Sequence, residues 1–252
     1  MTKFSDLGLQ EEILRTLQEL GYSDPTPIQE QAIPELLAGH DVIGQAQTGT
    51  GKTAAFGLPL LQYLDSSSEE TQAIVLTPTR ELCIQVTQAL RAYAEHIDVE
   101  IVAVFGGAPI STQQSRLRHG AHVVVATVGR MMDLISRRSL VLTSARYVVL
   151  DEADEMLDLG FIEDVEKILR MCPSGRQTAL FSATIPAPIA RLAEQHMYDA
   201  VTIKITPKKL TVDAIEQAYV EVEPRRKTER LVEVLRAEEP EQAIIFCRTK
   251  IG

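Results

Sequence analysis

Short apolar runs alternate with amphipathic stretches along most of this chain. Six runs have the length of a strand, are rich in β-branched residues and are apolar at nearly every position: residues 41–44, 73–76, 101–104, 122–125, 147–150 and 178–181. Such continuous apolarity is typical of strands that are buried on both faces of a parallel sheet. The stretches between them, such as residues 81–96, place apolar side chains at helical spacing. The alternation predicts an α/β domain whose mostly parallel central sheet is flanked by helices.

The two ends of the chain depart from this alternation. The first 40 residues indicate two short helices on either side of Pro25 and Pro27. Near the other end, the run Thr206–Lys209 predicts a boundary, followed by a strand over 217–222, a helix over 226–236 and a strand over 243–247. Two strands and one helix can bury little core alone. We therefore expect this last segment to be the truncated start of a second domain.

Composition narrows the class of protein. Of 252 residues, 45% are hydrophobic and 24% are charged, which is ordinary for a globular protein. No apolar run is long enough to span a membrane, the first residues do not resemble a secretion signal, and the three cysteines are far apart. These features favour a cytoplasmic protein with reduced thiols. The net charge of -10 argues against a simple polycationic nucleic-acid binder, so any nucleic-acid contact must be local.

One loop has the composition of a phosphate-binding site. Residues 46–53 read Ala-Gln-Thr-Gly-Thr-Gly-Lys-Thr, and they follow an expected strand and precede a helix-like run. Glycines let backbone N–H groups wrap phosphates, a lysine adds positive charge, and a threonine hydroxyl can hold Mg²⁺. The first position is Ala46 instead of the usual glycine. The flanking elements favour a nucleotide site over a chance glycine-rich loop.

Acidic residues follow another expected strand. Asp151, Glu152 and Asp154 come directly after residues 147–150, at the edge where open α/β sheets bind ligands. In a nucleotide site, Asp151 would hold Mg²⁺, through water, and Glu152 would orient and deprotonate the attacking water. The alternative is a charged turn at a helix N-terminus. The phosphate-type loop upstream favours the nucleotide site.

These motifs, in this order, resemble those of the bacterial DEAD-box ATP-dependent RNA helicases. Asp151–Asp154 spells the motif that names the family. Other segments similar to the family's motifs are Gly21-Tyr22 with Pro25–Gln29 (the Q motif), Ala46–Thr53, Pro78–Leu82, Gly106-Gly107, Thr127–Arg130, Ser182–Thr184 and Ile244–Thr249. The resemblance covers nearly the whole chain. Val128 departs from the pattern, since the family usually has proline there, and the later motifs of the second domain are absent.

The resemblance implies a RecA-like P-loop domain over residues 1–206, with the Q-motif region in 1–40. A linker over 207–216 and the start of a second RecA-like domain over 217–252 would follow. It also implies roles for individual residues. Those expected to bind ATP are Phe4, Gln29, Gln47, Thr48, Gly49, Thr50, Gly51, Lys52, Thr53 and Asp151, of which Thr53 and Asp151 would hold Mg²⁺. Those expected in catalysis are Lys52, Asp151 and Glu152, and those expected in coupling are Asp154, Ser182 and Thr184.

RNA contact is implied for a third set: Pro78, Thr79, Arg80, Gly106, Gly107, Thr127, Gly129 and Arg130. Glycines permit close backbone approach, hydroxyls can bind sugars, and arginines can bind phosphates. We therefore expect backbone recognition with weak sequence preference. Three alternatives stay open here. Phe4 could be a core contact, Gln29 an ordinary polar residue at a helix start, and either arginine could pair with a carboxylate instead.

Taken together, the sequence predicts an RNA-dependent ATPase that unwinds short RNA duplexes. The family's second domain supplies arginines to the γ-phosphate, so we expect this fragment to bind adenine nucleotide as a monomer and to hydrolyse it barely. Two alternatives are an RNA clamp or scaffold that uses nucleotide as a switch and a related superfamily 2 DNA translocase. Glu152 argues against the first, and the Q motif with the Asp151–Asp154 spelling argues against the second.

Overall fold

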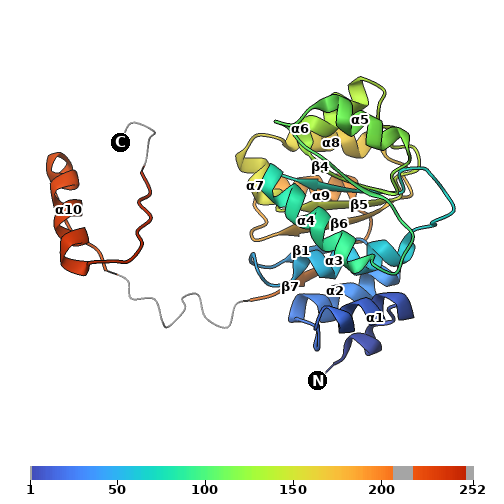
Figure 1. The fold of residues 1–252 in the computed structure, drawn as a ribbon, viewed down its shortest axis with the longest axis horizontal. Helices are drawn as coiled ribbons and strands as arrows, with labels where there is room; N and C mark the ends of the chain where they lie inside the picture. The colour runs from blue at the N-terminus through green and yellow to red at the C-terminus, as the bar shows by residue number, and fades with distance from the viewer. Residues whose placement is uncertain (1, 207–217, 248–252) are drawn as a thin grey trace. The chain divides into compact units, whose positions relative to one another are not determined.

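The structure is a computed structural model that describes residues 2–206 and 218–247. It divides into a large unit, residues 1–207, and a small unit, residues 208–252, which are drawn in Figure 1 and are considered separately. The expected linker over 207–216 and the last residues of the expected motif Ile244–Thr249 lie outside the described residues. No helix among the residues described is long and apolar enough to cross a membrane.

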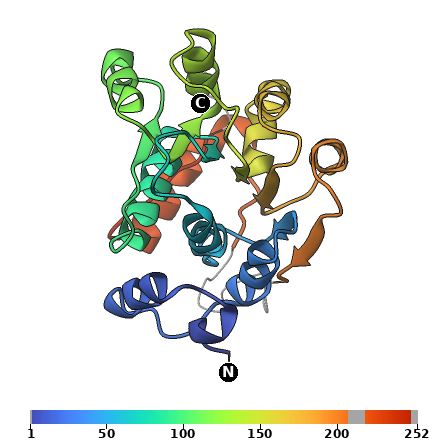
Figure 2. The same ribbon diagram turned by 90° about the vertical axis from the view of Figure 1, so that its right-hand side faces the viewer.

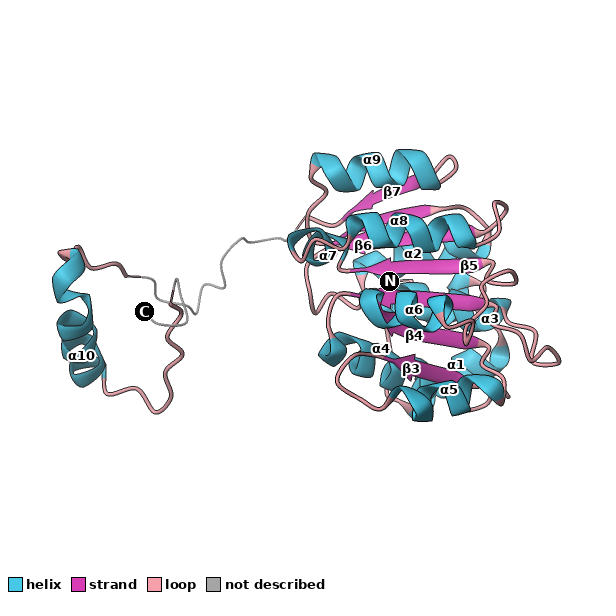
Figure 3. Cartoon of the chain, turned by 90° about the horizontal axis from the view of Figure 1, so that it is seen from above, coloured by secondary structure: helices cyan, strands magenta, loops and turns pink. Residues whose placement is uncertain are grey.

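The large unit is built on one seven-stranded sheet. Its strands lie in the order β3-β4-β2-β5-β6-β1-β7, and every neighbouring pair is parallel, which confirms the α/β fold predicted from the sequence (Figure 3). The strands are β1 (Val42–Gln45), β2 (Ala73–Thr77), β3 (Ile101–Val104), β4 (Val123–Thr127), β5 (Tyr147–Asp151), β6 (Gln177–Ser182) and β7 (Val201–Lys204).

Burial on both faces explains why these strands are apolar at successive positions. In β2, Ala73 and Val75 pack into the core on one face of the sheet, whereas Ile74 and Leu76 pack into the core on the other face. Alternate side chains of a strand point to opposite faces, so a strand covered on both sides needs apolar residues at every position. The six strands identified in the sequence are therefore those with apolar side chains buried on both faces, including β3 at one edge of the sheet.

Helices form a layer on each face. One core includes residues of the 3₁₀ helix η1 and helices α1–α4, and the other includes residues of α5–α9. Figures 1 and 2 show the N-terminal helices in blue at one end of the large unit and the green helices α5 and α6 at the other. The helices are η1 (Phe4–Leu7), α1 (Glu11–Glu19), α2 (Pro27–Leu37), α3 (Lys52–Tyr63), α4 (Arg80–Tyr93), α5 (Ile110–Arg118), α6 (Val128–Ser136), α7 (Ala153–Asp158), α8 (Ile162–Met171) and α9 (Ala187–His196).

One strand of the large unit was not predicted. The strand β7 has only four residues, and three of them are exposed or half-buried while Ile203 is buried. It pairs only with β1, at the edge of the sheet. The strand β7 lacks the continuous apolar run that identified the other six strands, so the sequence pattern alone does not predict it.

The small unit corrects two strand predictions. Its helix α10 (Lys227–Glu238) forms close to the expected position, after the short 3₁₀ helix η2 (Pro224–Arg226). Residues 218–222 and 243–247, however, are not strands. Their apolar side chains are largely exposed, with Tyr219 at 86%, Ile244 at 83% and Phe246 at 93%. Because a strand needs a partner for its backbone hydrogen bonds and a core for its apolar face, composition alone does not produce one.

Candidate functional site

Residues singled out in the sequence follow six strands of the sheet. Because all of these strands are parallel, their carboxyl ends meet at one edge. The nucleotide-type residues come from β1, β5 and β6, and the RNA-type residues come from β2, β3 and β4. These two groups are neighbouring blocks in the strand order. The fold therefore brings both expected sites to the same edge, side by side.

The loop between β1 and α3 has the geometry of a phosphate-binding loop. Gly49 and Gly51 have φ angles of 82° and 91°, a conformation that side-chain-bearing residues rarely adopt. Gly51 caps the first turn of α3, and Lys52 and Thr53 are the first helical residues. The N-terminus of a helix presents free N–H groups and a partial positive charge, which together attract phosphate.

A cavity of about 520 Å³ opens beside this loop. Its wall includes Thr48, Gly49, Gly51, Lys52, Thr53, Asp151 and Glu152, so the residues expected to hold phosphate and Mg²⁺ are brought together, while Gln47 and Thr50 lie in the loop without lining the cavity.

Two buried charged atoms in the cavity wall have no partner. Lys52 Nζ and Asp151 Oδ1 are buried without a hydrogen bond, although burying such groups unpaired is costly. A phosphate for Lys52 and a cation for Asp151 would satisfy both, so the residues present fit a nucleotide with Mg²⁺. Burial raises the pKa of Asp151 to about 7, against the opposing effect of the nearby Lys52. A bound cation would favour the ionised carboxylate.

Glu152 has a strained backbone. Its φ and ψ angles are 56° and 54°, in the left-handed region, and it caps the N-terminus of α7. A non-glycine residue pays about 1–2 kcal/mol for this conformation, a cost that proteins commonly tolerate at functional sites. Its carboxylate accepts a hydrogen bond from Thr48 Oγ1 at 3.3 Å. The turn therefore directs Glu152 toward the phosphate loop.

The three residues expected to couple the two sites are joined by hydrogen bonds. Asp154 Oδ2 accepts bonds from the backbone N–H and the hydroxyl of Thr184, both at 2.9 Å. Ser182 Oγ accepts a bond from the backbone N–H of Asp154, and Ser182 O accepts one from Ala46 N. Burial opposes ionisation of Asp154, but the hydrogen bonds from Ser182 and Thr184 outweigh it and lower the pKa. The end of β6 therefore links the phosphate loop to α7.

Gln29 joins the start of α2 to the phosphate loop. Its amide oxygen accepts a bond from Thr26 N at 2.9 Å, which completes a capping box, and its amide nitrogen donates to Gly51 O at 3.0 Å. A Cβ on Gly51 would collide with that amide nitrogen. Gln29 is buried, and it lines the cavity. Gln29 therefore does cap the start of a helix, which was the alternative considered above, but the same amide also holds the phosphate loop.

Phe4 lies away from the cavity wall. Phe4 is 5% exposed, belongs to the core, and does not line the cavity. Two aromatic residues line the cavity, Tyr22 and Tyr93, and the ring of Tyr22 meets Phe4 edge-on with centroids 6.3 Å apart. The Tyr22 hydroxyl also lies 3.2 Å from that of Tyr93. Phe4 thus supports Tyr22 from behind, and Tyr22 is the more exposed of these two rings.

Sequence reasoning also missed one face of α4. Five of its residues line the cavity: Leu82, Gln85, Val86, Ala89 and Tyr93. Their spacing places them on one face of the helix, where the apolar pattern indicates only core packing. The same helix begins at Arg80, one of the residues expected to contact RNA. One rigid element therefore borders both sites.

The RNA-type residues at the ends of β2 and β3 are in contact. Pro78 is buried, and Thr79 caps α4 by accepting a bond from Leu82 N at 3.2 Å. Arg80 is exposed, and its guanidinium lies 4.9 Å from the centre of the Phe105 ring. Gly107, with φ of 77°, is close enough that a Cβ there would lie 3.3 Å from Arg80 Nη1. The glycine loop and the arginine thus form one polar surface.

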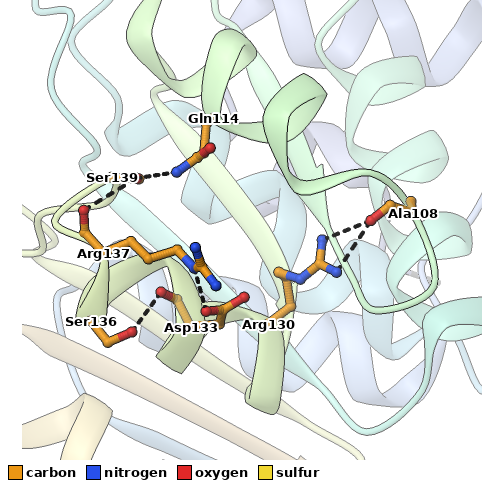
Figure 4. A network of polar contacts seen from close by, with 7 residues as sticks. All are labelled: Ala108, Gln114, Arg130, Asp133, Ser136, Arg137 and Ser139. Carbon is orange, nitrogen blue, oxygen red and sulfur yellow. Dashed lines mark hydrogen bonds and ion pairs between the residues drawn. The ribbon is translucent and has the colours of Figure 1, made fainter.

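The loop after β3 is held from two sides. Arg130, on α6, donates from both terminal nitrogens to Ala108 O at 3.2 Å, as Figure 4 shows. This partner is a backbone carbonyl and not the carboxylate considered above. Gln113, on α5, bonds both the N–H and the C=O of Phe105, at 3.2 and 3.1 Å. Nothing in the sequence pattern marked Gln113, because a buried glutamine with two backbone partners has no distinctive spacing.

The remaining residues of this set begin or precede a helix. Thr127 is the N-cap of α6 and Gly129 is exposed in its first turn. Val128, which departs from the family pattern, is fully buried at the start of α6. An apolar side chain there packs into the core, so the helix start is anchored without proline.

Comparison with known proteins gives consistent matches. The family model described as DEAD/DEAH box helicase matches residues 26–192. The chain is 48% identical over 250 residues to the DEAD-box ATP-dependent RNA helicase CshA of Bacillus cereus and equally to the ATP-dependent RNA helicase CshA of Listeria monocytogenes. Both matches cover 99% of this chain and 48% of the relative. The chain thus spans about half the length of these curated relatives.

Solved structures match as well. A DEAD box protein from Methanococcus jannaschii has a TM-score of 0.78 at 40% identity, over 93% of this chain and 63% of that one. The RNA helicase Prp28 from Chaetomium thermophilum, bound to ADP, has a TM-score of 0.76 at 38% identity, over 95% and 58%.

Proposed function

Because the chain belongs to the DEAD/DEAH box helicase family, we propose that it carries the nucleotide site and part of the RNA site of an ATP-dependent RNA helicase. The observation that carries the proposal is the pair of unpartnered buried atoms, Lys52 Nζ and Asp151 Oδ1, in a cavity beside a glycine loop. A buried lysine without a partner can bind a phosphate, and a buried carboxylate without a partner can bind the cation that accompanies it.

Each residue of the site then has a chemical role. The backbone N–H groups of the loop and Lys52 bind the β- and γ-phosphates, and Tyr22 stacks on the adenine. Thr53 and Asp151 would hold Mg²⁺, and the cation would neutralise phosphate charge. Glu152 orients the attacking water, and its carboxylate accepts the proton. Thr48, which bonds Glu152, keeps that carboxylate at the phosphate loop.

RNA would bind at the ends of β2, β3 and β4. The exposed groups there are glycine backbone, a threonine hydroxyl and Arg80, which suit sugar and phosphate contacts and give weak sequence preference. The hydrogen bonds that join Asp154 to Ser182 and Thr184 provide the connection through which phosphate state changes the position of α7. We place this activity in a reducing compartment, the cytoplasm, because Cys83 and Cys172 are buried free thiols.

Turnover by these 252 residues should be slow. No arginine lines the cavity among the residues described. An arginine that contacts the transferred phosphoryl group accelerates related reactions by about 10³–10⁵. We therefore infer that the polypeptide binds ATP and hydrolyses it at a small fraction of the rate of a helicase with both domains.

Calorimetric titration with ADP and GDP, in the presence of Mg²⁺, tests the proposal. We expect ADP to bind and GDP to fail, and Lys52→Ala to abolish ADP binding. Gln29→Glu keeps the shape of the side chain but places a carboxylate oxygen against Gly51 O, so it should weaken ADP binding as well. Lys167→Ala, on the exposed side of α8, is the control. ADP binding that survives Lys52→Ala unchanged would exclude this site.

A further inference from the structure

Positive charge is concentrated in one part of this acidic chain. Residues 101–146 contain six arginines and a single acidic residue, Asp133, and so carry a net charge of +5. The whole chain carries -10, so the remaining residues together carry -15. This segment forms β3, α5, β4 and α6, the part of the sheet that ends in the RNA-type loops. Its charge is too large to result from Arg130 alone.

The two helices of this segment connect the RNA-type loops to a second group of arginines. Helix α5 begins just after Gly106 and Gly107, and helix α6 begins just after Thr127. Both helices have nine residues, and they end at the opposite edge of the sheet, where the arginines lie. A nine-residue helix is roughly 13 Å long, a distance that a nucleic-acid strand spans in a few nucleotides.

The arginines near these helix ends and before strand β5 are available to a ligand. We call Arg116, Arg118, Arg138 and Arg146 the far arginine patch. All four are exposed, and none makes an ion pair with a carboxylate within residues 2–206 or 218–247. Arg137, beside them, is paired with Asp133 at 2.6 Å. Because no neighbouring carboxylate neutralises these exposed arginines, they can bind an anion.

Two nearby carboxylates do not cancel this charge. Glu70 lines the hollow next to Arg118, but it accepts a hydrogen bond from Ser144 Oγ at 2.7 Å. Glu69 packs against Gly120 at the end of the same helix. The patch has four positive charges and these two carboxylates have two negative ones, so this surface stays positive although the rest of the chain is strongly negative.

The helix ends are fixed relative to one another. Gln114 on α5 donates to Ser139 Oγ at 2.7 Å, just after the end of α6, and Figure 4 shows this bond beside the Arg137–Asp133 pair. Arg118 and Ser139 also line one hollow of about 260 Å³. Arginines on a rigid frame lose less conformational entropy when they bind than arginines on separate mobile loops.

We propose that the far arginine patch is a second contact for RNA phosphates, which extends the RNA path from the loops along the outer ends of α5 and α6. The proposal rests on the proposed function, since it assumes RNA at the loops. RNA fits better than an acidic protein because the patch lies on the same two helices that start at those loops. A strand of RNA can therefore reach both sites at once.

Fluorescence anisotropy with two RNAs tests this directly. A single strand of about three nucleotides is roughly 10 Å long, shorter than the helices, and reaches only the loops, whereas one of about 20 nucleotides reaches the patch as well. The variant Arg118→Glu with Arg138→Glu reverses two patch charges. The control, Arg15→Glu with Arg191→Glu, makes the same change in net charge on α1 and α9, where both arginines are exposed. ADP binding, measured on each protein, reports an intact fold.

We expect the short RNA to bind all three proteins alike and the long RNA to bind the patch variant more weakly. Losing two phosphate contacts removes about 1.4 from the slope of log K against log salt. Between 50 and 200 mM salt, wild type should therefore lose about sevenfold more affinity for the long RNA than the variant does.

Equal binding of the long RNA by the patch variant and the control would overturn the inference while leaving the proposed function standing. Failure of wild type to bind either RNA would overturn both. A polyglutamate peptide that binds wild type but not the patch variant, with no change in RNA binding, would identify the patch as a protein-binding surface instead.

Discussion

Replacing Tyr22 should weaken adenine nucleotide binding, whereas replacing Phe4 should not. Tyr22 lines the cavity and is 40% exposed, while Phe4 is 5% exposed and lies behind it. Tyr22 is supported by two edge-on aromatic contacts, with ring centroids 6.3 Å from Phe4 and 6.1 Å from Tyr93. These contacts orient the ring before a ligand arrives, so its surface is available for stacking without further ordering.

The expected magnitude follows from stacking energies. Stacking of a base on an aromatic side chain contributes about 1–3 kcal/mol by alanine substitution. Tyr22→Ala should therefore weaken ADP binding about 5- to 150-fold. Tyr22→Phe keeps the ring and loses only the contact with the Tyr93 hydroxyl, so it should cost about 1 kcal/mol of stability and little affinity.

Calorimetry on the four proteins, wild type, Tyr22→Ala, Tyr22→Phe and Phe4→Leu, measures the effect. Phe4→Leu preserves an apolar core side chain, so it should lower the free energy of unfolding by less than about 1.5 kcal/mol and leave ADP affinity near that of wild type. If Phe4→Leu reduced ADP affinity more than Tyr22→Ala, Phe4 and not Tyr22 would be the ring that stacks on adenine.

Three further predictions concern the coupling bonds, the sheet and the cation. Thr184→Val removes the hydroxyl donor to Asp154 and should lower the free energy of unfolding by about 1 kcal/mol. These bonds lower the pKa of Asp154, so the stability they add requires an ionised carboxylate. The difference in the free energy of unfolding between wild type and Thr184→Val, measured by urea denaturation, should therefore be largest above about pH 4 and disappear in acid. A difference that grows in acid would refute this prediction. Gly44→Ala places a Cβ 2.5 Å from the Phe181 ring, so it should destabilise by about 1–3 kcal/mol in thermal unfolding, and an unchanged melting temperature would contradict the packing. Since the pKa of Asp151 is raised to about 7 and the protonated acid cannot hold a cation, affinity for Mg²⁺-ADP should fall as pH drops below 7. Asp151→Asn should bind weakly at every pH, and an equally steep pH dependence in this variant would assign the titration to another group.

The strands β1 to β6 could be predicted because burial on both faces imposes an apolar residue at nearly every position. The phosphate loop and the acids after β5 could be found because their chemistry depends on residues that are adjacent in the chain. The strand β7 could not, since a short edge strand needs only Ile203 to be buried. Residues 218–222 and 243–247 have suitable composition but lack a sheet to join, which no local pattern reveals.

The features of the site that the sequence did not reveal depend on how the chain packs. The sequence proposes Phe4 as the aromatic residue of the site, and only the packing of Tyr22 against Phe4 and Tyr93 brings Tyr22 to the cavity wall. The left-handed conformation of Glu152 and the two bonds from Gln113 to Phe105 also arise from tertiary contacts. In each case the residue type permits the role, and only the fold selects it.

We infer that one edge of the sheet holds nucleotide and RNA in adjacent blocks of strands. Hydrogen–deuterium exchange, with Mg²⁺-ADP and with a short RNA added separately, is the first experiment to do. We expect ADP to protect residues 22–29 and 48–53, and RNA to protect residues 79–82, 105–108 and 127–130. Protection of the second set by ADP with no change in the first, or protection by RNA confined to the opposite edge of the sheet, would contradict it.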